Sequence, residues 1–245
     1  MDWKSRLYDS YVSNKQAGIA NDSEKSLNSS RSFYIRSLIT RHIPINRDSR
    51  IVDLGCGYGL FLYELRQAGY QKIGGVDHSG EQVKVAHSLG IRDVEQGDIK
   101  EYLIRLPDRS VDVVLIMDVL EHLTREELFV ILDEVLRVLD AGGICMAHVP
   151  NAEGLFGMRI RYGDLTHEQA YTSKSIRQAF LTVGFSTPRC VEDKPVVHGL
   201  IESYSSRIVG NRNHLPTGAF GRRNWGIPNN SFTKHVSYCA EVAHV

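Results

Sequence analysis

Short apolar runs alternate with amphipathic stretches along the chain from about residue 50 to residue 185. The short runs are rich in valine, isoleucine and leucine. In the longer stretches the apolar residues recur at the three- and four-residue spacing of a helix. This alternation is typical of repeated strand-helix-strand units, which form a mostly parallel sheet with helices on both faces. The pattern therefore predicts an α/β fold.

Seven segments have the length and patterning of strands. They lie at 50–54, 72–77, near Val94, and at 111–117, 144–149, 189–192 and 235–245. The last segment alternates apolar and polar residues, so we expect it to complete the sheet. Residues 195–234 then form an excursion between the sixth and seventh strands, and their content of Asn, Arg and Gly indicates loop.

A capping pattern marks the start of the longest expected helix. Thr124 is followed three positions later by Glu127, which predicts a capping box. A buried stripe runs from there to Leu139, and Gly142 and Gly143 are expected to end the helix.

Other helices are delimited in the same way. Ser173 or Ser175 is expected to start a helix that Gly184 ends. Further helices are expected at 60–68, at 80–89 and at 30–43, the last with Phe33, Leu38 and Ile39 facing inward.

Glycines and carboxylates occur where the expected strands end. Gly55, Gly57 and Gly59 come directly after the first strand, and Asp53 lies within it. The later strands end in Asp77, Asp98 and Asp118. Ligands of an open parallel sheet bind outside the carboxyl ends of its strands, and glycines let a ligand approach backbone N–H groups. We therefore expect one cofactor at this edge, with Asp77 accepting two hydrogen bonds from a ribose.

The segment Val52-Asp-Leu-Gly-Cys-Gly-Tyr-Gly, with Gly75-Val-Asp, Gly97-Asp and 112–123, resembles the successive motifs of class I S-adenosylmethionine-dependent methyltransferases. The resemblance spans about residues 50–150 and implies a Rossmann-like, seven-stranded sheet whose last strand is antiparallel. It also implies S-adenosyl-L-methionine as the cofactor. The nicotinamide-binding pattern differs, because its third glycine usually comes one residue later, where this chain has Leu60.

The resemblance also implies which residues contact the cofactor. The glycine turn would meet its amino-acid part, Asp77 the ribose and Asp98 the adenine. Tyr8 and Tyr11 resemble aromatic residues that close over the cofactor from an N-terminal helix. The cofactor contacts implied are Asp53, Gly55, Cys56, Gly57, Gly59, Asp77, His78, Asp98, Ile99, Met117, Asp118, His122 and Tyr11.

The segment 161–168, Arg-Tyr-Gly-Asp-Leu-Thr-His-Glu, follows the fifth strand. It resembles segments of bacterial methyltransferases of glycan and small-molecule pathways, and we expect it to form the acceptor loop. Histidine is the usual general base near neutral pH, so His167, tuned by Asp164 and Glu168, is the first candidate base and His122 the second. A turn cluster that fastens the loop is the structural alternative. Two carboxylates and one histidine this close in sequence rarely suffice for a divalent cation, and we expect no metal.

Within Asp118-Val-Leu-Glu-His, which is expected to open a helix, the family resemblance places Glu121 and His122 toward the methionine or the acceptor. The structural alternative is an acidic residue stabilised by the helix dipole beside a packed histidine.

Length and charge narrow the classes of function. A chain of 245 residues is expected to form one domain, with a helical cap at 1–49, a cofactor-binding core at 50–150 and acceptor-side loops, a helix and final strands at 151–245. Lys plus Arg and Asp plus Glu are balanced at 29 each, so the basic field that suits a nucleic-acid partner is absent overall. The four cysteines have no metal spacing and are expected to be reduced. Because no segment resembles a secretory signal or a membrane span, we expect a cytoplasmic protein without membrane insertion.

Together these features predict O-methylation of a saccharide or another small polar metabolite. Arginines within 195–234 could receive a phosphate, so a phosphorylated or nucleotide-linked acceptor stays open. N-methylation of a small amine or phosphate-bearing metabolite, a non-catalytic cofactor-binding subunit and a homodimer also stay open.

Overall fold

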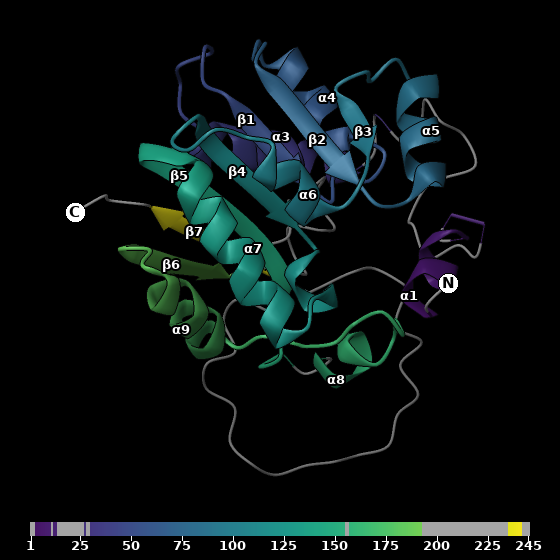
Figure 1. The fold of residues 1–245 in the computed structure, drawn as a ribbon, viewed down its shortest axis with the longest axis vertical. Coiled ribbons are helices and arrows are strands. Elements are labelled where there is room, and N and C mark those ends of the chain that lie inside the picture. The colour runs from purple at the N-terminus through teal and green to yellow at the C-terminus, as the bar shows by residue number, and fades with distance from the viewer. Residues whose placement is uncertain are drawn as a thin grey trace, which may run out of the picture.

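The computed structural model shows a β-sheet between two layers of helices (Figure 1). It describes residues 3–10, 12–13, 27, 30–154, 157–192 and 235–241. The strand order is β3-β2-β1-β4-β5-β7-β6. The strands are β1 (Ile51–Leu54), β2 (Ile73–Asp77), β3 (Val94–Gln96), β4 (Val111–Met117), β5 (Leu139–Pro150), β6 (Thr187–Glu192) and β7 (His235–Glu241).

The first five strands are parallel, and β7 runs antiparallel between β5 and β6. In a parallel sheet the carboxyl ends of the strands meet at one edge, which brings the residues after β1, β2 and β4 together. The predicted α/β fold class and its parallel core are therefore confirmed.

Helices connect the strands and cover both faces of the sheet. They are α1 (Trp3–Tyr8), α3 (Ser30–His42), α4 (Leu60–Gln67), α5 (Gly80–Ser88), α6 (Ile99–Ile104), the 3-10 turn η1 (Leu120–His122), α7 (Arg125–Val138), α8 (Gly157–Arg161) and α9 (Ser173–Val183). The apolar pattern did not predict α1, α6 or α8, and only the family resemblance implied an N-terminal helix. These helices have six, six and five residues, too few for a clear periodic pattern.

Alternate residues of the central strands enter two separate cores. Val113 and Leu115 of β4 are buried with side chains of α3, α4 and α5, whereas Val114 and Ile116 are buried with side chains of α6, α7 and α9. Figure 1 shows α7 crossing the front of the sheet. Because successive side chains of a strand point to opposite faces, a continuous apolar strand is what two covered faces require.

The start of α7 is as predicted, but its end is not. Thr124 caps the helix and forms a capping box with Glu127. The predicted end at Gly142 and Gly143 is wrong, because α7 ends at Val138 and β5 begins at Leu139. Leu139 pairs with Val111 of β4 and is fully buried, so its apolar character reflects a strand position and not a helical stripe.

The cap of α9 also differs from the prediction. Thr172, and neither Ser173 nor Ser175, is the N-cap, and the side chain of Ser175 completes the capping box. The chain leaves the helix at Gly184 with φ of 119°, as the glycine predicted.

One inward-facing residue of α3 was assigned wrongly. Leu38 and Ile39 are buried as expected, but Phe33 is 48% exposed and its ring lies 5.5 Å from the guanidinium carbon of Arg36. The guanidinium of Arg36 therefore packs over the ring of Phe33, which stays at the surface and does not join the core.

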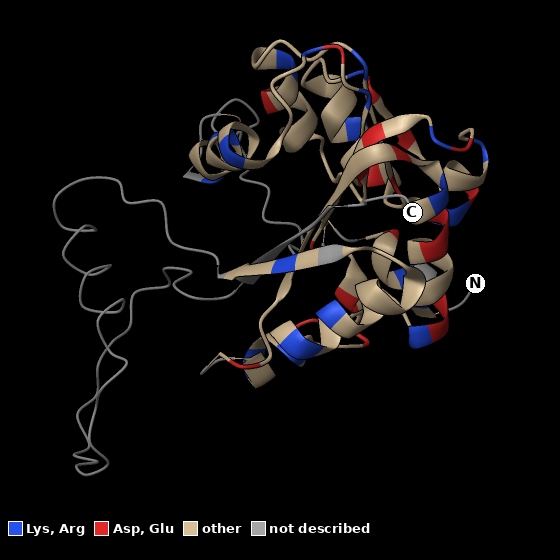
Figure 2. Cartoon of the chain, turned by 90° about the vertical axis from the view of Figure 1, so that its left-hand side faces the viewer, with Lys and Arg blue, Asp and Glu red and all other residues tan. Residues whose placement is uncertain are grey.

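Figure 2 shows Lys and Arg interspersed with Asp and Glu over the described helices. Among the described residues, no helix is long and apolar enough to cross a membrane. Tyr11 and the excursion 195–234 lie outside the described residues, so their assignments stay predictions.

Candidate active site

The glycine turn after β1 needs its three glycines for steric reasons. Gly55, Gly57 and Gly59 have φ of 71°, 56° and 78°, in the left-handed region that other residues rarely adopt. A Cβ atom on Gly55 would lie 2.3 Å from Cγ2 of Val119, which is closer than any real contact. A side chain at the first glycine would therefore have to displace Val119.

The backbone N–H groups of the turn bond within the protein. Those of Gly55 and Cys56 donate to the carbonyl of Val76 at 2.8 and 3.1 Å, and that of Gly57 donates to Oδ2 of Asp77 at 2.7 Å. The prediction that the glycines expose these N–H groups to a ligand is therefore wrong for these three residues. The hydrogen bonds instead hold the turn in shape.

Asp77 at the end of β2 connects two loops. Its Oδ2 atom accepts from Gly57, and its Oδ1 atom accepts from the N–H of Ser79 at 2.8 Å. Burial raises the pKa of Asp77 above its ordinary value, and the two backbone hydrogen bonds offset this only in part. Because each carboxylate oxygen can accept a second hydrogen bond, a ribose contact at Asp77 stays compatible with the geometry.

Asp53 lies inside β1 beneath the glycine turn and is 2% exposed. Burial, together with the charge of Asp77, raises the pKa of Asp53 to about 7, while Arg31 opposes this shift. No described residue forms a hydrogen bond with the buried Oδ1 atom of Asp53. A buried carboxyl group with a free acceptor atom fits a cationic or hydrogen-bond-donating ligand group.

The remaining cofactor candidates lie around the same edge. Asp98 is the N-cap of α6, its Oδ1 atom accepting from two N–H groups, and Ile99 is the first residue of that helix. Met117 ends β4, and the ring of His78 lies 5.3 Å from that of Tyr8. The structure places these residues but does not test their predicted contacts.

Asp118 has φ of 57°, which is unusual outside glycine. Its Oδ1 atom lies 2.6 Å from Nδ1 of His148 on β5, and its Oδ2 atom lies 3.4 Å from the guanidinium of Arg31. Sequence analysis did not identify His148 or Arg31. The signal for His148 was a polar residue within an otherwise apolar strand, where buried polar groups need a partner.

Glu121 and His122 belong to the 3-10 turn η1 and do not open a helix as predicted, because α7 begins only after Thr124. Glu121 is 1% exposed, and its Oε2 atom is buried with no hydrogen-bond partner in the described part of the chain. Burial, with the charge of Asp118, raises the pKa of Glu121 well above its ordinary value.

The predicted acceptor loop is attached to η1 by backbone hydrogen bonds. The carbonyl of Glu121 accepts from the N–H groups of Glu168 and Gln169 at 2.8 and 3.0 Å. The guanidinium of Arg161 donates to the carbonyls of His167 and Glu168. The loop therefore lies over the sheet edge, as predicted, and packs on η1.

A hydrogen-bonded chain orients the ring of His122. Its Nδ1 atom lies 2.8 Å from Oγ1 of Thr166, whose hydroxyl donates to Oδ1 of Asp164 at 2.6 Å. Burial acts to raise the pKa of Asp164, but the hydrogen bonds from Thr166 outweigh it and the pKa is lowered, so Asp164 is an acceptor near neutral pH. The threonine hydroxyl has one proton, so Nδ1 of His122 is the protonated nitrogen and Nε2 holds the lone pair.

His167 is oriented in a similar way by the main chain. Its Nδ1 atom lies 3.0 Å from the carbonyl of Ile160, which can only accept, so Nε2 again holds the lone pair. We predicted carboxylates as the orienting groups. The ring is instead held by this carbonyl, and the Glu168 carboxylate lies 3.6 Å from the amine of Lys4.

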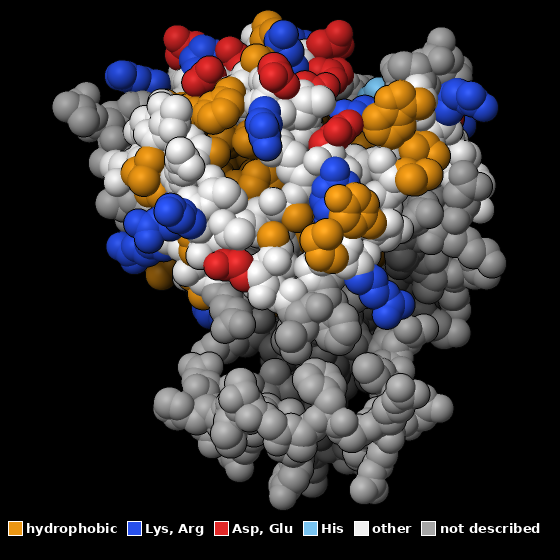
Figure 3. Space-filling view, turned by 90° about the horizontal axis from the view of Figure 1, so that it is seen from below, with side chains coloured by type: hydrophobic (Ala, Val, Ile, Leu, Met, Phe, Trp, Pro, Cys, Tyr) orange, Lys and Arg blue, Asp and Glu red, His pale blue; other side chains and the backbone are white. Residues whose placement is uncertain are grey.

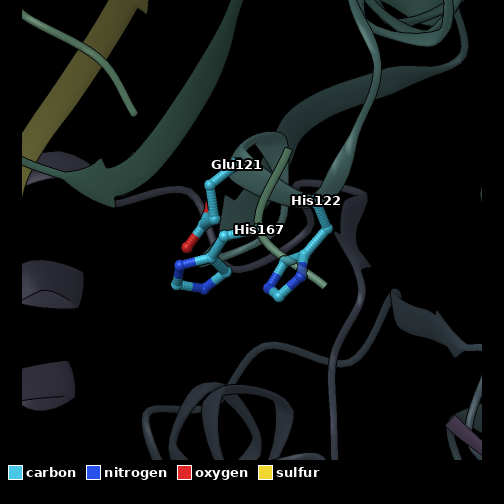
Figure 4. Close-up of side chains that lie close together, drawn as sticks. All are labelled: Glu121, His122 and His167. Atoms are coloured by element: carbon cyan, nitrogen blue, oxygen red, sulfur yellow. The ribbon is translucent and has the colours of Figure 1, made fainter. Parts of the chain in front are cut away.

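Figure 4 shows Glu121, His122 and His167 side by side, contributed by η1 and by the loop after α8. The two imidazole rings are 4.7 Å apart between centroids and meet edge to face. Burial, with the neighbouring His167, lowers the pKa of His122 to about 4. The structure thus brings together the two candidate bases and a buried glutamate.

Helix α1 closes this edge of the site. The ring of Tyr8 lies 6.4 Å from that of His122, and burial raises the pKa of Tyr8 above its ordinary value. The amine of Lys4 donates to the carbonyl of His122 at 3.1 Å. The N-terminal helix therefore contacts the site, as the family resemblance implied for Tyr8.

Known methyltransferases are similar to this chain in sequence. Residues 52–147 match the family model described as a methyltransferase domain. A probable S-adenosylmethionine-dependent methyltransferase of Mycolicibacterium smegmatis is 30% identical over 61% of this chain and 55% of its own. A ubiquinone biosynthesis O-methyltransferase of Azorhizobium caulinodans is 33% identical over 42% of this chain and 44% of its own. The matches thus span about half the length of these relatives.

The fold has close counterparts among solved structures. A SAM-dependent methyltransferase from Archaeoglobus fulgidus superposes with a TM-score of 0.64 at 23% identity, covering 89% of this chain and 97% of that one. The fold is therefore the Rossmann-like methyltransferase fold. The chain contains a class I S-adenosylmethionine-dependent methyltransferase domain, and S-adenosylmethionine is its cofactor, as the motifs implied.

Proposed function

We propose that this protein transfers the methyl group of S-adenosylmethionine to a hydroxyl oxygen of a saccharide or another small polar acceptor. The observation that carries the proposal is the pair of imidazoles at the sheet edge, both with Nδ1 engaged and Nε2 holding a lone pair. A hydroxyl acceptor must lose a proton to a base when it is methylated, whereas an amine acceptor depends less on such a base. The relatives include both O-methyltransferases and N-methyltransferases, so the choice of an oxygen acceptor rests on the imidazole pair.

In this proposal the cofactor lies over the glycine turn, with Asp53 and Asp77 as its acidic contacts. The sulfonium already activates the methyl group, so the protein has to align the acceptor for in-line attack and exclude water. The acceptor oxygen forms a bond to the methyl carbon while the carbon-sulfur bond breaks, and the electrons of that bond stay on sulfur. No enzyme nucleophile is required.

We propose that His167 accepts the proton that the acceptor hydroxyl loses. A base with a pKa of about 4, as His122 has, holds a proton weakly at neutral pH. His122 then serves mainly to orient the acceptor by accepting a hydrogen bond at Nε2. The hydrogen bonds through Thr166 to Asp164 hold the ring proton on Nδ1, so Nε2 keeps its lone pair.

Helix α8 and the outer side of the acceptor loop present exposed apolar side chains. Met158, Tyr162 and Leu165 are 69%, 69% and 80% exposed. Figure 3 shows hydrophobic side chains at the surface of this lower face beside Lys and Arg. An exposed aromatic ring next to a cation suits a saccharide, which presents both apolar C–H faces and hydroxyls.

The test is methyl transfer by the purified full chain with S-adenosylmethionine and matched acceptors. Free hexoses, nucleotide sugars and catechol represent hydroxyl acceptors, and ethanolamine and histamine represent amines. We expect S-adenosylhomocysteine to form with at least one hydroxyl acceptor and NMR to show an O-methyl product. A product methylated only on nitrogen, or tight cofactor binding without transfer to any acceptor, contradicts the proposal.

The cofactor side has a separate test. Asp77→Ala is expected to weaken S-adenosylmethionine binding by about 1–3 kcal/mol, because charge-assisted hydrogen bonds are lost. Calorimetry measures this directly, and Asp77→Asn, which keeps an acceptor oxygen, should lose less. Unchanged affinity in both variants would place the ribose elsewhere.

A further inference from the structure

We propose that Glu121, His122 and His167 bind a divalent transition-metal ion, with Zn²⁺ as the ion that best suits these ligands. Two imidazoles and one carboxylate are the protein ligands of many catalytic zinc sites, which keep a further coordination position open. We expected no metal from the sequence, because we considered only Asp164, His167 and Glu168. The cluster on which the present proposal rests became apparent only in the folded chain.

The distances allow coordination after a small adjustment. Each of the three residues offers one ligand atom, and these atoms all lie within 4.8 Å of one another. Ligand atoms of a tetrahedral zinc ion, with bonds of about 2.0–2.2 Å, are about 3.4 Å apart, so the side chains would need to approach by roughly 1.4 Å at most. Figure 4 shows the Glu121 carboxylate directed toward the ring of His167, with the ring of His122 beside it.

The buried glutamate is an independent indication of a ligand. Glu121 is 1% exposed, and its Oε2 atom is buried without a hydrogen-bond partner among the described residues. An acceptor atom in this state costs free energy unless a ligand satisfies it. A cation bound between Oε2 and the two rings would satisfy this atom.

The contacts behind the two rings are those of metal-bound histidines. Such a histidine usually donates its other ring N–H to a carbonyl or to a group linked to a carboxylate, which fixes the nitrogen that faces the metal. His167 donates to the carbonyl of Ile160, and His122 donates to Thr166, which in turn donates to Asp164. Both rings are thereby oriented with Nε2 available for coordination.

An ion at this position would act on the acceptor. A hydroxyl bound at the open coordination position loses its proton more readily, because the ion stabilises the alkoxide as a Lewis acid. Both Nε2 atoms are then ligands, so the proton leaves to solvent water whenever the ion is bound, and His167 accepts it only in the ion-free site. The alkoxide oxygen next forms the bond to the methyl carbon as the carbon-sulfur bond breaks. This step rests on the proposed methyl transfer, but zinc binding itself does not.

The test is zinc binding by the full chain after treatment with a chelator and its removal. Calorimetric titration with ZnCl₂, without cofactor or acceptor, is expected to show one ion per chain. His167→Asn and Glu121→Gln should each weaken binding at least tenfold. Thr166→Val, which removes the hydroxyl behind His122, should weaken it by about 10-fold. His42→Asn, a histidine on α3, is the matched control and should bind as the unmodified chain does.

A second readout guards against variants that fold poorly. Co²⁺ in place of zinc gives visible absorption that reports its ligands, and circular dichroism checks the fold of each variant. Absence of stoichiometric zinc binding, or binding that all three site variants retain, overturns the proposal. Because neither measurement uses methyl transfer, a negative zinc result leaves the proposed function standing. A failed acceptor screen likewise leaves the zinc result standing.

Discussion

The two halves of the site are built in different ways. The cofactor half, consisting of Asp53, the turn 55–59 and Asp77, follows two adjacent parallel strands and is held by hydrogen bonds to the backbone. The acceptor half, consisting of Glu121, His122, Asp164, Thr166 and His167, joins a 3-10 turn to a distant loop. Its side chains include a buried carboxylate oxygen close to two imidazoles, which are the ligands of the proposed zinc ion.

This difference indicates where each half can vary. Sheet register places the cofactor half before any ligand arrives, so changes there should alter stability and cofactor affinity. The acceptor half depends on how a loop packs on η1, so changes there should alter turnover more than cofactor affinity. Substitutions in each half test whether the two halves differ in this way.

The largest effect is expected for Asp53 as the pH changes. Its pKa of about 7 in the folded chain exceeds the ordinary value of 3.8, so the folded chain holds more protons between these pH values than the unfolded chain. The free energy of unfolding therefore falls as the pH rises from about 4 to 7. Asp53→Asn removes this loss, and its stability relative to the unmodified chain should rise by up to about 4 kcal/mol across that range. Urea unfolding at several pH values measures it, and parallel profiles for the two proteins would refute it.

His167→Ala should lower turnover by about 100-fold or more while cofactor affinity stays nearly unchanged. The substitution removes the residue that we propose accepts the proton of the acceptor, which is also a ligand of the proposed metal ion. Steady-state kinetics and calorimetry separate the two quantities. Glu168→Ala is the matched control, since its carboxylate pairs with Lys4. If His167→Ala turns over normally, the loop has a structural role only.

Gly55→Ala should destabilise the chain more than Gly90→Ala does. Both positions have positive φ, 71° and 80°, so both substitutions introduce backbone strain of about 1–3 kcal/mol. Only at Gly55 does the new Cβ atom also overlap Val119, whereas nothing lies within 4 Å of it at Gly90. The added loss should be about 1–3 kcal/mol in urea unfolding. Equal losses would mean that the turn can relax.

The smallest effect is expected for Thr166→Val. The substitution keeps the shape of the side chain but removes the hydroxyl between His122 and Asp164. Loss of one such hydrogen bond is worth about 1 kcal/mol, or roughly a fivefold fall in turnover. Thr166→Ser, which keeps the hydroxyl, should restore it. Failure of serine to restore turnover would separate His122 from the chemistry.

Some elements could be predicted because their signals are local. The capping box of Thr124 and Glu127 and the glycine at the end of α9 each depend on residues a few positions apart. Leu139 was assigned to a helix because its apolar side chain fits both a helical stripe and a buried strand. The sheet pairing with Val111 decides between them, and no short stretch of sequence contains that information.

The fold class, and the set of residues that meet at the carboxyl edge of the sheet, could be predicted from the sequence alone. Apolar periodicity specifies strands and helices, and parallel strands bring their terminal residues to one edge whatever the details of packing. Only the tertiary structure decided that the amides of the glycine turn bond internally and that Glu121 and His122 meet His167. These outcomes depend on contacts between residues distant along the chain, which hydrogen bonding and burial select only after the sheet has formed.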